Sequence, residues 1–183
     1  MTTRCDWALQ SKLEQDYHDN EWGKPVHEDQ KLFEFLVLES MQAGLSWSLI
    51  LKKRNNFKKA LDDFDYRKIA TYNEEKVQSL LNNPGIVRNQ LKIRATIHNA
   101  QEFLRIQEEY GSFDHFIWKQ VDNQITNNQW TKISDVPSSS DLSDQVTKRL
   151  KKEGFKFLGT TSVYSFLQAV GIINDHLISC DFK

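Results

Sequence analysis

Two cysteines and two histidines near the two ends of the sequence form the first group that could do chemistry. Cys5 and His18 lie near the start, and His176 and Cys180 lie near the end. Two thiolates and two imidazoles are a tetrahedral ligand set that zinc prefers. His176 and Cys180 have the i, i+4 spacing that puts both side chains on one face of a helical turn. A closed four-ligand site would be structural, because no position is left for a substrate.

The alternative is that both cysteines are isolated thiols and both histidines are ordinary surface residues, and the residue types leave this open. No long apolar segment follows Met1, so we expect no secretory signal and a cytoplasmic protein. In that reducing compartment a disulfide between Cys5 and Cys180 is not expected. No stretch approaches the roughly 20 apolar residues of a membrane helix, so no membrane partner is expected.

A single carboxylate and several aromatic residues form the second group. Glu39 ends an apolar run, and Trp7, Tyr17 and Trp47 lie in the same third of the chain, in a cluster that also contains Trp22. Taken singly, helix glutamates are mostly solvated and aromatic residues mostly fill cores. Together they are what a pocket for an extruded nucleobase requires, namely rings for stacking and a carboxylate for hydrogen bonds.

The third group is a tight turn followed by cations. An Asn-Asn-Pro-Gly sequence at 82–85 lies between two helical patterns, and the backbone N–H groups of such a turn can hold a phosphate. Phosphate contacts of this kind hold DNA without reading its sequence. The alternative is an ordinary connector with solvated charges, which include a second basic cluster at 52–54. The candidate DNA contacts in these two segments are Lys52, Pro84, Gly85, Ile86, Val87, Arg88 and Lys92.

Helical periodicity dominates the elements that must position these groups, so we expect an all-α fold. The apolar run 32–38 predicts a buried helix that Gly44 ends, and Ser46 is the expected N-cap of the next helix. Asn73 is expected to start a third helix, and Gly111 to end a long one over 88–110. After a polar loop over 122–140 we expect helices over 142–153 and 161–170, with a strand over 155–158 as an alternative to coil.

Composition limits the remaining choices. The 183 residues carry 24 Lys and Arg against 25 Asp and Glu, a formal charge of -1, so nucleic-acid binding must come from a local basic surface. Only 7 Gly and 3 Pro disfavour a turn-rich β architecture. No internal repeat or long linker divides the chain, so we expect one domain over 1–183 and a monomer.

Six strings of this sequence resemble the bacterial 3-methyladenine DNA glycosylase I family. They are residues 17–23, 38–47, 51–54, 85–88, 154–161 and 174–176. The resemblance is collinear from Cys5 to Cys180. It implies the helix-hairpin-helix glycosylase fold, with two helical lobes around a base-binding cleft and the hairpin over about residues 77–97. It also implies a structural zinc ion that joins the two termini through all four ligands, Cys5, His18, His176 and Cys180.

The resemblance implies an enzyme of base excision repair that hydrolyses the glycosidic bond of 3-methyladenine in double-stranded alkylated DNA and releases the free base. Glu39 and Tyr17 match the catalytic residues of the family, and Trp7 and Trp47 complete the base-binding set. One departure is Glu14, at a position where the family often has tyrosine.

The resemblance also implies how the base leaves the duplex, because Gly44 and Leu45 match the segment that enters the DNA at the vacated position. The catalytic aspartate usual in the superfamily has no counterpart. A 3-methyladenine nucleotide is already cationic, so its glycosidic bond is weak and the enzyme needs mainly to extrude and recognise it. The alternatives are a non-catalytic helix-hairpin-helix module that binds damaged DNA and a zinc-stabilised scaffold for protein partners. An intact set of Glu39, Tyr17 and Trp47 favours the enzyme.

Overall fold

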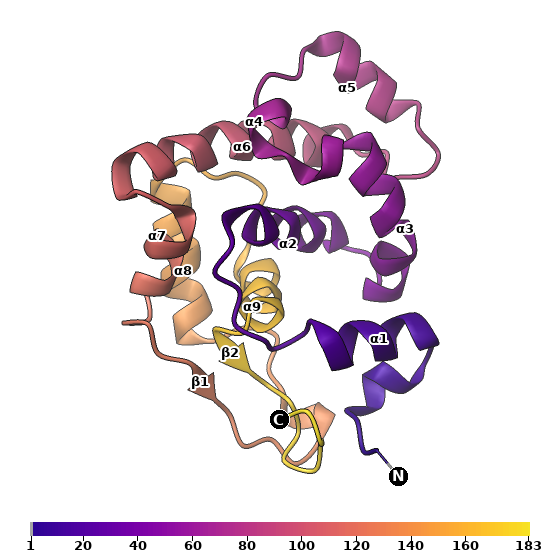
Figure 1. Cartoon of the computed structure of the whole chain (residues 1–183), viewed down its shortest axis with the longest axis vertical. Coiled ribbons are helices and arrows are strands. Elements are labelled where there is room, and N and C mark those ends of the chain that lie inside the picture. The colour runs from indigo at the N-terminus through magenta and orange to yellow at the C-terminus, as the bar shows by residue number, and fades with distance from the viewer. Residues whose placement is uncertain (1) are drawn as a thin grey trace.

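The computed structural model describes residues 2–183, and nine α-helices account for most of that part of the chain (Figure 1). The helices are α1 (Lys12–Asn20), α2 (Asp29–Gln42), α3 (Trp47–Ala60), α4 (Tyr66–Ile69), α5 (Glu74–Leu81), α6 (Gln90–Tyr110), α7 (Phe113–Lys119), α8 (Asp141–Lys152) and α9 (Thr160–Ala169). The smaller elements are the 3-10 turns η1 (Asp6–Leu9), η2 (Asp62–Phe64) and η3 (Ile133–Asp135), and the strands β1 (Thr126–Asn127) and β2 (Ile173–Asn174).

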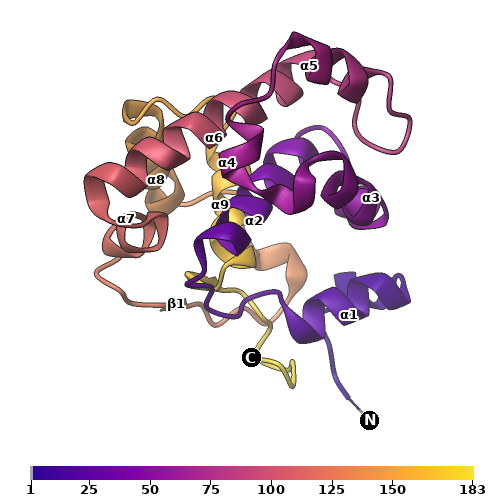
Figure 2. The same ribbon diagram turned by 45° about the horizontal axis from the view of Figure 1, so that its top comes forward.

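Helix α2 lies at the centre of the molecule. It packs against α3, α6, α7 and α9, and Figures 1 and 2 show it surrounded by them. Its residues from Leu32 to Met41 are buried with the single exception of Glu34. The expectation of a helix that is apolar nearly all round is therefore confirmed, and the physical reason is that neighbouring helices cover every side of it.

Several expected helix boundaries are confirmed by their capping contacts. The side chain of Ser46 accepts a hydrogen bond from the backbone N–H of Leu49 and starts α3. Asn73 caps α5 in the same way, and α6 ends at Gly111, which has a φ of 88°. Asn89 caps α6 through its side chain, so this helix begins slightly later than its pattern predicts.

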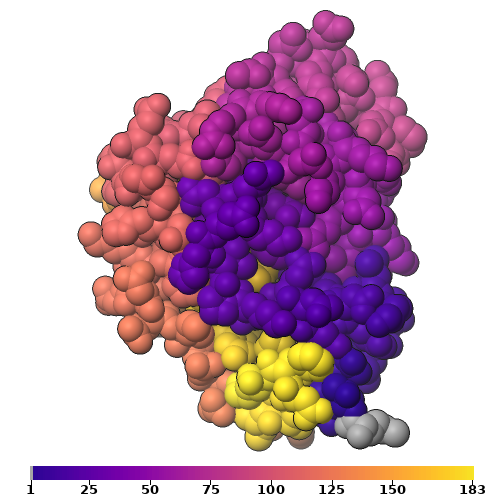
Figure 3. Space-filling view, in the orientation of Figure 1, coloured from indigo at the N-terminus to yellow at the C-terminus, as the bar shows by residue number. Residues whose placement is uncertain are grey.

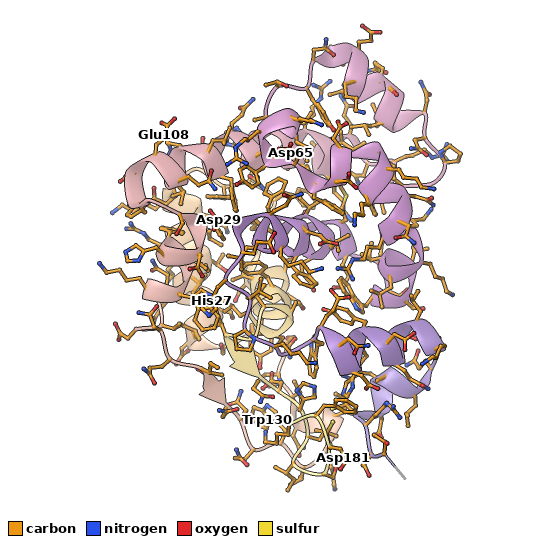
Figure 4. All side chains as sticks on the ribbon, viewed as in Figure 1. His27, Asp29, Asp65, Glu108, Trp130 and Asp181 are labelled. Atoms are coloured by element: carbon orange, nitrogen blue, oxygen red, sulfur yellow. The ribbon has the colours of Figure 1, made fainter. Side chains whose placement is uncertain are left out.

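Three helices have no counterpart in the sequence-based expectations, α1, α4 and α7. Helix α7 begins directly after its N-cap Ser112, and its first backbone N–H groups, of Phe113 and Asp114, both donate to the carboxylate of Asp29. Asp29 stands at the start of α2, so one side chain fixes α7 to the central helix (Figure 4). A seven-residue helix held by a distant cap is too short to show a clear period.

The described chain also contains a parallel strand pair, which the all-α expectation did not include. Thr126 pairs with Ile173 and Asn127 with Asn174, so the polar loop is tied to the segment that follows α9. The alternative of a strand over 155–158 is wrong, because that segment is coil. Two-residue strands are too short for an alternating pattern to reveal them.

The two ends of the described chain lie side by side. The backbone N–H of Asp181 donates to the carbonyl of Thr3 at 3.0 Å, and the N–H of Thr3 donates to the Asp181 carboxylate at 2.8 Å. Figure 3 shows the C-terminal segment in yellow against the N-terminal segment in indigo. Across residues 2–183, the helices are too short or too polar to cross a bilayer.

Candidate active site

A cavity of about 390 Å³ opens between α1, α2, α3, α9 and the segment around η3. It brings together the four aromatic and acidic residues that the sequence singled out. Its lining includes Trp7, Glu14, Tyr17, Trp22, Glu39, Gln42, Trp47, Ile133, Val136, Ser165, Gln168 and Asp175. Residues far apart in the sequence thus form one pocket beside the central helix.

Glu39 enters this cavity from the last turns of α2 and is only 4% exposed. Its Oε2 atom is buried and has no hydrogen-bond partner in the described chain. Burial raises the pKa of Glu39 to about 8, because water no longer solvates the charged form. An unpartnered carboxyl group that faces a cavity is costly to the fold, and a ligand that donates hydrogen bonds would remove that cost.

Tyr17 on α1 and Trp47 at the start of α3 form an aromatic corner beside Glu39. Their ring centroids are 5.2 Å apart and the ring planes are inclined by 50°. The Tyr17 hydroxyl and the Trp47 Nε1 are buried and have no hydrogen-bond partner in the described chain. Burial, and next the nearby Glu39, raise the pKa of Tyr17, so its hydroxyl keeps its proton and remains a donor.

Trp7 and Trp22 make a second aromatic wall. Trp7 lies on η1 with its ring centroid 6.3 Å from that of Tyr17 and 5.0 Å from that of Trp22. Sequence reasoning placed Trp22 in the same cluster but gave it no role in the pocket. Its position directly after α1, a few residues beyond Tyr17, was the available signal.

The carboxylates of Asp175 and Glu14 also line the cavity, and only Asp175 had no predicted connection with it. Asp175 is 1% exposed and accepts hydrogen bonds from four neutral groups, on Asn128, Trp130, Tyr164 and Gln168. It therefore joins the polar loop, on which Figure 4 labels Trp130, to α9. Glu14 is 5% exposed and its Oε2 accepts a hydrogen bond from the Ser11 hydroxyl, so the residue that departs from the family pattern is part of the pocket wall.

Three of the four expected metal ligands converge at the joined chain ends. The ligand atoms of Cys5, His18 and Cys180 all lie within 4.8 Å of one another, and all three residues are buried. The Cys180 Sγ is 3.5 Å from the His18 Nε2. The His18 Nδ1 lies 2.8 Å from an Asp19 carboxylate oxygen, which orients the ring so that Nε2 faces the thiols.

His176 is adjacent to this group rather than within it. Its ring centroid is 4.8 Å from that of His18, and its Nδ1 lies 3.0 Å from the Asn174 side-chain oxygen. Its Nε2 is buried with no partner, which fits a fourth ligand. Burial lowers the pKa of His176 to about 4, so the imidazole stays neutral, the form that binds metals. The expected helical turn from His176 to Cys180 is wrong, because this segment is coil and turn.

The turn between α5 and α6 is held from α3. Lys53 Nζ donates to the carbonyl of Pro84 at 3.3 Å, and Asn56 Nδ2 donates to the carbonyl of Gly85 at 3.1 Å. Arg88 is exposed at the end of the turn, whereas the side chain of Ile86 is buried in the core. The backbone N–H groups of Gly85 and Ile86 both donate within the turn, to the Asn83 Oδ1 at 2.8 Å and to the Asn83 carbonyl at 3.4 Å.

Some cations of the two basic clusters are exposed, and others are bonded within the protein. Lys52 is exposed, but Arg54 is mostly buried and forms salt bridges with Glu21 and Glu34. The prediction that Lys92 contacts DNA needs correction, because this residue is only 5% exposed. Its ammonium group donates to two backbone carbonyls. The periodicity of a long amphipathic helix did not reveal that this lysine is on its inner side.

The segment expected to enter the DNA, Gly44 and Leu45, forms an exposed tip at the rim of a second, smaller cavity. Gly44 and Leu45 are both exposed, and Gly44 has a φ of 78°, a conformation that favours glycine. They line a cavity of about 170 Å³ together with Glu39 and residues 161–165 at the start of α9. The exposed tip thus lies next to the carboxylate that faces the pocket.

The chain is similar to known proteins over its whole length. The family model described as methyladenine glycosylase matches residues 7–183. A protein of Escherichia coli (strain K12) named DNA-3-methyladenine glycosylase 1 is 46% identical over 177 residues, which cover 97% of this chain and 95% of that protein. A Haemophilus influenzae protein named DNA-3-methyladenine glycosylase is 40% identical over 183 residues, covering 100% of this chain and 99% of that protein.

Solved structures give the same result for the fold. A crystal structure of 3-methyladenine DNA glycosylase I matches with a TM-score of 0.95 at 47% identity and covers 98% of both chains. The glycosylase I from Staphylococcus aureus, from a study of 3-methyladenine recognition, matches with a TM-score of 0.94 at 38% identity, covering 98% of this chain and 96% of that one. The chain therefore belongs to the methyladenine glycosylase family.

Proposed function

We propose that this protein is a DNA-3-methyladenine glycosylase, an enzyme of base excision repair that hydrolyses the N-glycosyl bond of 3-methyladenine in alkylated double-stranded DNA. The observation that carries the proposal is a set of three buried polar atoms without partners, on Tyr17, Glu39 and Trp47, all from residues lining one aromatic cavity. Its volume falls within the range of about 300–1,000 Å³ typical of small-ligand sites. The names of the relatives agree with this substrate.

Recognition rests on charge and hydrogen bonding. The 3-methyladenine nucleotide is a cation, so its arrival favours the ionised form of Glu39, which then accepts charge-assisted hydrogen bonds from the base. The rings of Tyr17 and Trp47 attract a cationic base through their faces, by about 0.5–2 kcal/mol for each contact. Unmodified adenine lacks this charge, so it gains less from the same pocket.

Hydrolysis needs little further catalysis. The bond between the sugar and the cationic base breaks with its electron pair on the base, which leaves as a neutral molecule. Water adds to the sugar carbon and releases one proton to the solvent. Glu39 and Tyr17 are the catalytic residues of this proposal, because they hold the base while the bond breaks and stabilise its charge distribution. None of the described residues that line the cavity is a lysine, which agrees with a glycosylase that forms no Schiff base with the sugar.

DNA is held on the side of the cavity where the α5–α6 turn and the Gly44–Leu45 tip lie. In this proposal residues 77–97 form a helix-hairpin-helix element, and two helical lobes of a single domain, 1–183, surround the base-binding cleft. In this proposal residues 84–87 lie against a phosphate. Because the N–H groups of Gly85 and Ile86 already donate to Asn83, the exposed Lys52 and Arg88 supply the main cationic contacts. Leu45, which is 38% exposed, enters the duplex where the nucleotide has left.

A structural zinc ion completes the proposal. Cys5, His18 and Cys180 supply three ligands and His176 the fourth, through its unpartnered Nε2. Burial raises the pKa of the Cys5 thiol to about 12, and a nearby divalent cation is what would favour its thiolate form. Bound zinc would fix the two chain ends and take no part in the reaction. We further propose a monomer that acts in the bacterial cytoplasm.

The proposal is tested by incubating the protein with methylated duplex DNA and separating the released bases by chromatography. Release of free 3-methyladenine, without strand cleavage, is the expected result. Binding to damaged duplex with no released base would instead support the non-catalytic DNA-binding module. A catalytically weakened Glu39→Gln variant, run in parallel, excludes a contaminating glycosylase as the source of the base.

A further inference from the structure

A buried lysine holds the end of the central helix. Lys92 stands in the first turn of α6, where its own backbone N–H is capped by the Asn89 side chain. Its ammonium group donates to the carbonyl of Met41 at 2.7 Å and to that of Ala43 at 2.6 Å. Both partners are backbone carbonyl oxygens, not carboxylates. A buried cation without a carboxylate partner is expensive, so its retention calls for a role.

The two carbonyls belong to the point where α2 ends. The last carbonyls of a helix have no partners within it, and a cation there satisfies them and interacts favourably with the helix dipole. Met41 lies in the last turn of α2, and Ala43 is the residue at which the chain leaves the helix. Phe157 covers the site, with its ring centroid 6.0 Å from the Lys92 Nζ. The ammonium group therefore fixes the direction in which the chain leaves α2.

The chain that leaves α2 here is the exposed Gly44–Leu45 tip. The N–H of Leu45 donates to the carbonyl of Gln42 at 2.6 Å, which closes a tight turn before Ser46 starts α3. The same lysine is on the first turn of α6, immediately after the connection 82–89. One side chain thus spans the tip and the α5–α6 connection.

We propose that Lys92 is a positioning residue that sets the Gly44–Leu45 tip in register with the α5–α6 turn, so that the tip enters the duplex at the nucleotide whose neighbouring phosphates the turn holds. This inference rests on the proposed glycosylase function. The extrusion of a nucleotide costs a few kcal/mol and needs the tip at a defined position. A displacement of about 1 Å in such a group lowers a rate by up to about a hundredfold.

The test compares Lys92→Met with the wild type in three measurements. Lys92→Met keeps the length and apolar volume of the side chain but removes the donors. We expect the single-turnover rate of base release from duplex DNA to fall about ten- to a hundredfold. We expect the dissociation constant of free 3-methyladenine, followed by tryptophan fluorescence, to be unchanged because Lys92 does not line the pocket.

The salt dependence of binding to undamaged duplex separates a positioning lysine from one that contacts phosphate. A direct phosphate contact contributes about one unit to the slope of log affinity against log salt concentration. We expect Lys92→Met to keep the wild-type slope and Lys52→Met, which removes an exposed cation, to lower it. Lys148→Met, which removes an exposed lysine on α8, controls for the loss of one charge.

The outcomes are distinguishable. A wild-type protein that releases no 3-methyladenine refutes the proposed function. With an active wild type, the positioning role is overturned if Lys92→Met excises at the wild-type rate, lowers the slope by about one unit, or weakens free-base binding as much as excision. If Lys92→Met does not fold, Lys92→Gln retains one donor group. The role is then supported if Lys92→Gln excises the base more slowly than the wild type and the Lys148→Met control, while it binds the free base with unchanged affinity. A wild-type excision rate in Lys92→Gln overturns the role.

Discussion

The rings of Tyr17 and Trp47 meet at 5.2 Å, and each carries a buried polar atom that no other group of the described chain satisfies. Native interiors leave few such atoms, because each one costs free energy. Two of them at one aromatic corner, beside the unpartnered Glu39 carboxyl group, indicate that the hydrogen bonds are completed by a ligand.

Glu39→Gln is expected to lower base release strongly and to leave the fold intact. The substitution keeps the shape of the side chain and removes the charge that a cationic base requires. A hydrogen bond to a charged group contributes about 1.5–3 kcal/mol, which corresponds to a loss of about ten- to a hundredfold in rate. Single-turnover excision measures it, with Glu108→Gln as the control, because Glu108 is exposed on α6 and distant from the pocket (Figure 4). Equal release by the mutant and the wild type would reject the role.

The stability of the free protein is expected to decline with rising pH because of Glu39. Burial raises its pKa from 4.5 to about 8, so the folded protein retains a proton that the unfolded chain releases in this range. The contribution of Glu39 to the free energy of unfolding is complete below pH 4.5, falls as the pH rises, and is lost above about pH 8. Chemical denaturation of the wild type and Glu39→Gln across this range should give curves that diverge. Parallel curves would mean that Glu39 titrates normally.

The aromatic ring of Trp47 is expected to contribute more to the affinity for 3-methyladenine than its indole N–H does. Stacking of an aromatic side chain on a base contributes about 1–3 kcal/mol, and phenylalanine retains most of it. Trp47→Ala should therefore weaken the binding of free 3-methyladenine far more than Trp47→Phe does. Isothermal titration with the free base gives both affinities. If the two variants bind equally, the base does not stack on this residue.

Cys180→Ala is expected to reduce both the zinc content and the thermal stability of the protein. Removal of one thiolate weakens a four-ligand site, and the two chain ends then lose their connection. Zinc is measured by elemental analysis of the purified protein, and unfolding by calorimetry with and without a chelator. The chelator should lower the unfolding temperature of the wild type and leave that of the variant nearly unchanged. An unchanged zinc content in Cys180→Ala would show that the ligand assignment is mistaken.

Local sequence signals were sufficient for many of the helices. The apolar run before Glu39 predicted the buried central helix, and Ser46, Asn73 and Gly111 each marked a boundary that the structure confirms. These features act over a few residues, through caps and through burial on one or all sides of a helix. They can therefore be predicted from the sequence without knowledge of the tertiary contacts.

Features that depend on distant contacts were missed or wrong. The strand pair of β1 and β2 joins segments nearly fifty residues apart, and two residues in each strand leave no alternating pattern. Lys92 had the residue type of a DNA contact, but its partners belong to α2, so only the folded structure reveals its burial. Asp175 was part of a recognised string without an assigned role, because its four donors come from separate parts of the chain.

Asp175 and His176 are consecutive in the sequence, yet one lines the pocket and the other lies beside the thiols at the chain ends. A base in the pocket and a zinc ion at the chain ends would therefore both restrict the peptide unit between these two residues. Thermodynamic linkage then requires reciprocity: if zinc raises the affinity for the base by some factor, the base must raise the affinity for zinc by that same factor. The affinity for zinc, measured by equilibrium competition with a chromogenic chelator, should accordingly rise when 3-methyladenine is present. A zinc affinity that is independent of the base would mean that the two sites are energetically separate despite sharing one backbone segment.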